Sequence, residues 1–136
     1  MAATDQKRET LVTGVDFVSV PTRDLERAVA FYGETLGLPM SVHHPERNFA
    51  EFETGTVTLS VVDPEGMGIG AFQANKSHLA LHVEDVAQAR ATLEERGVAF
   101  HGDILDTGVC HMAIFADPDG NALMLHHRYA PRVTRD

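Results

Sequence analysis

Apolar and polar positions alternate between residues 15 and 20, and the pattern then changes to one typical of a helix. Alternation places successive side chains on opposite faces, which predicts a short strand. Asp24 is a favourable N-cap residue, and Gly37 can adopt the left-handed conformation that ends a helix. The positions between them form one apolar stripe with helical spacing: Leu25, Ala28, Val29, Tyr32 and Leu36. The segment 14–40 is therefore predicted to be a strand followed by an amphipathic helix.

A shorter copy of this strand-and-helix unit occupies residues 78–98. A strand is predicted for 78–83, Asp85 is the expected N-cap, and Gly97 is the expected end of the helix. The apolar stripe of this second helix consists of Val86, Ala89 and Leu93. Internal repetition constrains the architecture of a chain, so two similar modules are expected.

Three more strands are predicted after the first helix, over 40–44, 49–53 and 56–62. Thr54 and Gly55 are interpreted as a two-residue hairpin turn, which places Glu51 opposite Thr58. One face of this hairpin is then apolar, and the helix would pack against it. The other face carries the remaining side chains: Phe49, Glu51, Thr58 and Ser60.

The second helix is also followed by three predicted strands, over 98–100, 110–116 and 121–127. A four-residue turn at 117–120 has strong turn chemistry and would place His111 opposite His126, and Phe115 opposite Ala122. Each module thus reads βαβββ. The expected organisation is one α+β domain with these parts: first module 12–63, connecting loop 64–76, second module 77–130, and flexible termini 1–11 and 131–136.

Composition narrows the choice of partners. The formal charge of −9 disfavours nucleic acid and anionic membranes, since both attract clustered Lys and Arg. The single cysteine excludes an intrachain disulfide and suits a reducing cytosol. No apolar run approaches the length of a membrane span, and the polar first residues do not resemble a secretory signal. A cytoplasmic protein without nucleic-acid or membrane partners is expected.

Three segments resemble the vicinal oxygen chelate superfamily, which includes glyoxalase I, bleomycin resistance proteins and extradiol dioxygenases. They are DLERAVAFYGETLGL (24–38), HLALHVEDV (78–86) and FADPDGNALML (115–125). The resemblance covers nearly the whole chain from Gly14 to Arg128. It implies that the two modules form a curved eight-stranded mixed-sheet cup with the helices outside. It does not specify a reaction, because this fold carries many chemistries. Homodimers are usual among small members, with sites inside one chain or shared between two.

In the vicinal oxygen chelate superfamily, metal ligands project into the cup from the first and last strands of each module. The corresponding positions here are Phe17, Ser60, His78 and Met124. Only His78 matches, since Phe cannot coordinate a metal and Ser and Met are poor ligands for Zn²⁺, Ni²⁺, Mn²⁺ or Fe²⁺. No cofactor is therefore favoured, and a metal-independent binding protein is the preferred interpretation.

A displaced metal site remains an alternative. Opposed on neighbouring strands, His111 and His126 would lie close enough to share an ion with His78, and one divalent Zn, Ni, Mn or Fe ion is the candidate. His82 lies about 13 Å from His78 along an extended strand, so those two cannot bind one ion together. Glu51 and His126 are the tentative acid–base pair.

Two functions follow, and the sequence favours the first. One is binding of a small, partly aromatic or cationic molecule, as in bleomycin resistance proteins. The other is a lyase, isomerase or dioxygenase acting on a vicinal-oxygen substrate. A third interpretation is a domain whose cup is filled by its own side chains. The candidate ligand-binding residues are Phe17, Phe49, Glu51, Ser60, His78, His82, His111, Phe115, Met124 and His126.

Overall fold

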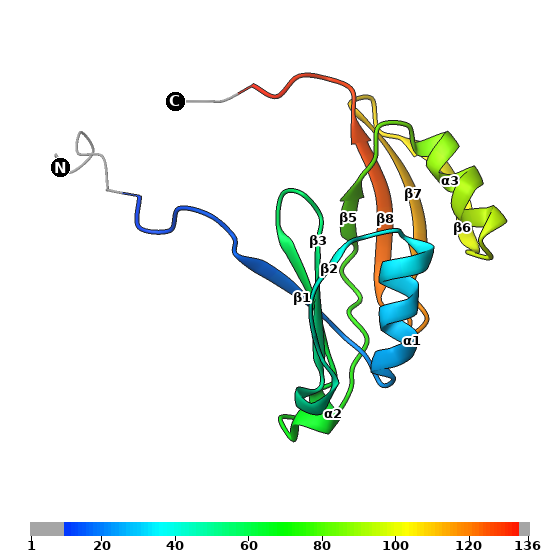
Figure 1. Ribbon diagram of the computed structural model, residues 1–136. Coiled ribbons are helices and arrows are strands. Elements are labelled where there is room, and N and C mark those ends of the chain that lie inside the picture. Colours follow the sequence, from blue (N-terminus) through cyan, green and yellow to red (C-terminus); the bar gives the residue numbers. More distant parts are fainter. Residues whose placement is uncertain (1–9, 134–136) are drawn as a thin grey trace, which may run out of the picture.

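The computed structural model describes residues 10–133, and it contains two consecutive βαβββ modules (Figure 1). The expected flexible termini fall largely on residues 1–9 and 134–136, outside the described part. The first module consists of β1 (Phe17–Pro21), α1 (Leu25–Ala30), η2 (Phe31–Thr35), β2 (Met40–His44), η3 (Pro45–Arg47), β3 (Phe49–Glu53) and β4 (Thr58–Val62). A short helix, α2 (Pro64–Met67), begins the connecting segment. The second module consists of β5 (Leu79–His82), α3 (Val86–Glu95), β6 (Phe100–Asp106), β7 (Cys110–Ala116) and β8 (Ala122–Arg128).

The strands form two mixed sheets of four. Sheet A has the order β1-β4-β3-β2 and sheet B the order β5-β8-β7-β6, and in each the first and last strands of the module run parallel. The α+β class with two similar modules is thus confirmed. The eight strands are divided between two hydrogen-bonded sheets within the chain, with β1 and β5 as edge strands. Within the described residues, no helix has the length and apolar character needed to cross a membrane.

Both helices begin where the sequence predicts. The side chain of Asp24 accepts a hydrogen bond from the backbone N–H of Arg27 at 3.2 Å, and Asp85 accepts one from Gln88 at 3.0 Å. These contacts satisfy amides that have no partner inside the helix. The first helix departs from expectation at its end, because the segment after Ala30 continues as a single π-helical turn, η2.

The turn between β3 and β4 is longer than predicted. Thr54 Oγ1 donates to the carbonyl of Val57 at 2.6 Å, which closes a four-residue loop. As a result, Glu51 lies opposite Ser60, and the predicted pairing of Glu51 with Thr58 is wrong. The register moves by two residues, and since side chains alternate with a period of two, every side chain keeps its predicted face.

The turn between β7 and β8 has a larger consequence. It contains five residues, 117–121, because the Asp117 carboxylate accepts the backbone N–H groups of Asp119 and Asn121, both at 2.9 Å. His111 therefore lies opposite His127, and the predicted pairing of His111 with His126 is wrong. A slip of one residue turns all of the β7 side chains to the other face of the sheet.

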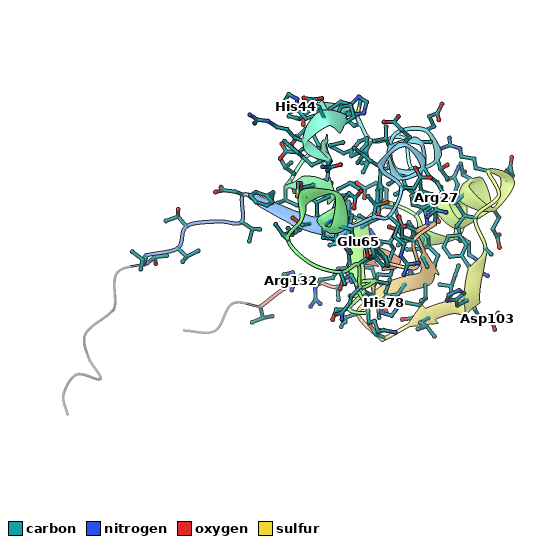
Figure 2. The ribbon with its side chains drawn as sticks, turned by 90° about the horizontal axis from the view of Figure 1, so that it is seen from below. Arg27, His44, Glu65, His78, Asp103 and Arg132 are labelled. Carbon is teal, nitrogen blue, oxygen red and sulfur yellow. The ribbon has the colours of Figure 1, made fainter. Side chains whose placement is uncertain are left out.

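The two modules share one hydrophobic core. It joins helix-facing residues of sheet A, such as Val20 and Leu59, to helix-facing residues of sheet B, such as Leu123 and Phe115. Arg96 at the end of α3 donates to the carbonyl of Thr35 in η2 at 2.7 Å. Seen from below, the sheets meet at an angle, and α1 and α3 both lie inside it (Figure 2). The helix-free faces of the two sheets consequently point outward in different directions.

Buried hydrogen bonds hold the modules together at the β7–β8 turn. Tyr32 donates to Asp117 at 2.7 Å, and Asn121 donates to the carbonyl of Pro21 at 2.7 Å. Close by, Thr22 donates to Asp119 at 2.6 Å, and Asp119 also pairs with Arg27. These contacts link the first strand and helix of module one to the last turn of module two.

The Tyr32 hydroxyl is expected to make the protein sensitive to alkaline pH. Burial, together with the neighbouring Asp117 carboxylate, raises the pKa of Tyr32 well above its usual range near 10. Above about pH 10 the unfolded chain releases this proton while the folded chain retains it. The free energy of unfolding should therefore fall by up to about 1.4 kcal/mol per pH unit. Urea unfolding between about pH 9 and 11.5 measures this slope.

Tyr129 is the matched control for this measurement. It is the other tyrosine of the chain, and its hydrogen bond to Asp106 also raises its pKa, although it is largely exposed. Tyr32→Phe should flatten the alkaline slope markedly, whereas Tyr129→Phe should change it little. Equal slopes in the native protein and in Tyr32→Phe would refute the role of the buried hydroxyl.

Candidate functional site

The helix-free face of sheet A carries four of the predicted site residues. Phe17 is on the edge strand β1 and is 57% exposed, while the alternate residues Val18 and Val20 point into the core. Phe49, Glu51 and Ser60 share the face of Phe17, since Glu51 lies opposite Ser60 and Ser60 pairs with Ser19 of β1. This face therefore combines an exposed aromatic ring with a carboxylate and small hydroxyl groups.

The helix-free face of sheet B carries a second group of predicted residues. His78 precedes β5 and lies at the edge of the molecule away from both helices (Figure 2). Met124 pairs with Ala80 and His126 pairs with His82, so Met124 and His126 lie on the helix-free face of this sheet. The ring of His82, the last residue of β5, lies instead 5.8 Å from that of His127. The core-facing residues of β5 and β8 are Leu79, Leu81, Leu123 and Leu125.

Two predicted site residues lie on the opposite face of sheet B. Phe115 is buried in the core, where its ring centroid is 5.0 Å from that of Phe100, and His111 shares its side of β7. The one-residue register difference explains both errors. It also places Met112 and Ile114 beside His126 and Met124, so these two apolar side chains are the part of the face that the sequence reasoning missed. The alternating pattern of β7 does place Met112 and Ile114 on one face. Which face that is follows only once the length of the β7–β8 turn is known.

The four family metal positions are divided between the two sheets. Phe17 and Ser60 lie on sheet A, and His78 and Met124 lie on sheet B. Sheet A thus offers a phenyl ring and a neutral hydroxyl, neither of which is a suitable ligand for a divalent transition metal. The residues present do not fit the family metal. The predicted trio of His78, His111 and His126 does not gather either, because His111 is on the other side of its sheet.

Carboxylates give the face of sheet A a negative character. Hydrogen bonds from Ser41 and Thr58 lower the pKa of Glu53, so this carboxylate stays ionised. Glu53 has the same side-chain direction as Glu51, two residues earlier in β3. Together with the chain's charge of −9, these two groups favour cationic over anionic ligands.

A separate cavity lies on the helix side, between the modules. Its volume is about 430 Å³, and its lining joins residues of both sheets and of α3, among them Val18, Leu59, Leu81, Leu93 and Leu125. Leu93 belongs to the apolar stripe predicted for the second helix, and it is buried. Of the predicted site residues, His82 alone belongs to the lining of this cavity.

One cluster of metal-ligating side chains does occur, away from the family positions. His82, Glu84 and His127 offer candidate ligand atoms that all lie within 4.8 Å of one another. His82 is among the residues predicted for the ligand pocket, whereas the sequence assigns no role in a site to Glu84 or His127. The available signal was a His-x-Glu spacing at the end of β5 beside a paired His126-His127 at the end of β8.

Comparison with known proteins agrees with the fold. TnmS3, an antibiotic binding protein from Streptomyces sp. CB03234, is 30% identical; the match covers 88% of this chain and 99% of that one, with a TM-score of 0.73. A glyoxalase/bleomycin resistance protein from the same organism is 31% identical over 85% of this chain and 100% of that chain, with a TM-score of 0.67. The uncharacterized protein YraH of Bacillus subtilis (strain 168) is 29% identical over 114 residues, which are 76% of this chain and 89% of YraH.

The sequence model of one superfamily matches residues 14–125, which span both modules and every strand of the fold except the end of β8. The chain therefore belongs to the Glyoxalase/Bleomycin resistance protein/Dioxygenase superfamily.

Proposed function

We propose that this protein binds a small, partly aromatic and cationic organic molecule without the help of a metal ion. In this proposal the binding cup has two walls. One is the helix-free face of sheet A in one copy of the chain, and the other is the helix-free face of sheet B in a second copy. The observation that carries the proposal is the composition of these faces, in which Phe17 and Met124 occupy two of the four positions where the family places metal ligands, and Ser60 occupies a third.

The shape of the single chain supports a shared cup. The two helix-facing sides are already covered by a common core, whereas Phe17 remains 57% exposed on the helix-free face. These helix-free faces point in different directions within one chain, so neither can close over a ligand held by the other (Figure 2). A symmetric homodimer brings the same two surfaces together twice, and it would create two equivalent sites.

The side chains on the two faces favour a ligand that is aromatic and positively charged. Phe17 and Phe49 supply rings on which an aromatic group can stack, and Met112, Ile114 and Met124 supply apolar contact. Glu51 and Glu53 attract positive charge. Apolar walls with a few polar groups are the usual composition of a small-molecule site. The similarity to TnmS3, an antibiotic binding protein, supports an antibiotic as the ligand.

Metal-dependent lyase, isomerase or dioxygenase chemistry is the weaker alternative. It needs ligands from both walls, and sheet A supplies none that suits a transition metal. The proposed acid–base residues Glu51 and His126 lie on different sheets, so they could act on one substrate only across the shared cup. The geometry therefore favours binding.

Bleomycin and a panel of other aromatic, cationic antibiotics provide the test. The protein is purified without a histidine tag, treated with EDTA, and titrated by calorimetry and by thermal unfolding. A binder should take up one ligand per chain with EDTA present and return it chemically unchanged. Ligand at about 100 times its Kd should stabilise the fold by about 2.7 kcal/mol. Binding that appears only after metal is restored, or conversion of the ligand, would refute the proposal.

A further inference from the structure

His82, Glu84 and His127 form a compact group at one end of sheet B, just before α3. His82 Nε2 is 3.5 Å from Glu84 Oε2, and His127 Nδ1 is 3.9 Å from the same carboxylate oxygen. The centroids of the two imidazole rings are 5.8 Å apart. Among the described residues, this is the one trio of His, Cys, Asp or Glu side chains that is close enough to hold a metal ion.

The spacing of this trio agrees with tetrahedral coordination. Ligand atoms about 2.1 Å from a zinc ion are about 3.4 Å from one another in a tetrahedron. The two separations from Glu84 Oε2, 3.5 and 3.9 Å, are close to that value, and all three ligand atoms lie within 4.8 Å of one another. Two imidazoles and one carboxylate are also a donor set that Zn²⁺ accepts, with a fourth position left for water or another ligand.

The backbone holds the trio in place. Strands β5 and β8 are parallel and pair His82 with His126, which brings His127 next to the point where the chain leaves β5. The backbone N–H of Val83 donates to the carbonyl of His126 at 3.0 Å. The Nδ1 atom of His127 lies 3.2 Å from the carbonyl of Val83. This contact orients the imidazole of His127 beside Glu84.

We propose that His82, Glu84 and His127 bind one divalent transition metal ion of the Zn²⁺ class, at a site separate from the ligand cup. The site uses none of the positions where the family holds its metal. Glu84 and His127 also line a cleft of about 450 Å³ that includes His111 and Tyr129. The open coordination position can therefore bind a small ligand with an oxygen donor entering this cleft.

A matched control exists in the first module. His44 and Glu46 have the same His-x-Glu spacing, and their side chains lie 2.9 Å apart with comparable exposure. The described residues provide no third ligand there. If exposed His and Glu pairs were sufficient, both places would bind metal equally. If the third ligand matters, only the trio with His127 will bind.

Calorimetric titration of the tag-free, EDTA-treated protein with ZnCl₂ tests the proposal, and Co²⁺ absorption provides a second signal. We expect one saturable Zn²⁺ per chain. Glu84→Gln, at a side chain that is 87% exposed and has no role in packing, should weaken binding at least about tenfold. His82→Ala and His127→Ala should abolish it, and His44→Ala should leave it unchanged.

Two results would overturn the site. One is a Zn²⁺ affinity and stoichiometry that are the same in the native protein and in Glu84→Gln. The other is an equal loss in His44→Ala and in His82→Ala. Melting temperatures measured in EDTA distinguish a folding defect from the loss of a metal-binding side chain. His82 and Glu84 are exposed, so their variants should unfold at the same temperature as the native protein.

Discussion

Replacing Asp117 with alanine is expected to lower the free energy of unfolding by about 3–5 kcal/mol. The buried carboxylate accepts hydrogen bonds from Tyr32 and from the side chain of Asn121, and its other oxygen accepts two backbone N–H groups of its own turn. Alanine leaves these donors without a partner away from water, and an unpaired buried donor costs about 1–3 kcal/mol. Urea denaturation at pH 7 measures the change.

The control for this substitution is Asp103→Ala on β6. Asp103 is exposed, and a surface change of this kind should alter the free energy of unfolding by less than about 0.5 kcal/mol. Asp117→Ala should also free the two modules to change their relative orientation, since Tyr32 belongs to module one and Asp117 to module two. A loss below about 1 kcal/mol would show that this junction does not hold the modules together.

Phe17→Ala is expected to weaken ligand binding about 30-fold while leaving the fold intact. Phe17 is more than half exposed in the single chain, so folding gains little from it. On binding, an aromatic anchor that becomes fully desolvated contributes about 2 kcal/mol or more, which corresponds to that factor. Calorimetric titration with the antibiotic identified by the screen measures the change in Kd.

Ile69→Ala serves as the control for Phe17→Ala. Ile69 is an equally conspicuous exposed apolar side chain, but it follows α2 in the connecting segment and lies off both sheets. Its removal should leave the Kd within about twofold of the native value. If Phe17→Ala bound as tightly as Ile69→Ala, the helix-free face of sheet A would not be a wall of the site.

Much of the fold could be predicted from local signals. Asp24 and Asp85 cap their helices through side-chain contacts confined to one turn, and the bounds of β2 and β3 agree with the alternating pattern. The repeated unit was also sufficient to predict two βαβββ modules. In each case the responsible interactions connect residues that are close in the sequence.

The register of β7 and β8 could not be predicted in this way. Asn121 looks like the first residue of a strand, but its amide is buried, where it donates to Pro21 and accepts from the backbone N–H of Asn75. These contacts span 100 and 46 residues and add to the local contacts of Asp117, so the length of this turn depends in part on residues far away in the sequence. Because Asn121 belongs to the turn, the side chains of His111 and Phe115 lie on the face opposite to the predicted one. Part of the predicted site is therefore wrong.

The relative orientation of the two sheets could not be predicted from the sequence either. Each module has an apolar helix side, and the pattern does not reveal whether the helix sides of the two modules meet each other. In the structure they do, in one shared core, and this turns the predicted cup faces away from one another. In the proposed cup, Phe17 of one chain and Met124 of a second chain therefore lie on facing walls.

Subunit exchange between two variants tests the shared cup most directly. Phe17→Ala impairs the wall made by sheet A, and Met124→Ala impairs the wall made by sheet B, so each homodimer alone should bind poorly. After mixing and exchange, half of the dimers are mixed, and in each of them one site has two native walls. The account predicts that about one quarter of all sites recover the native Kd. If the mixture binds no better than the two variants kept apart, the cup is not built from two chains.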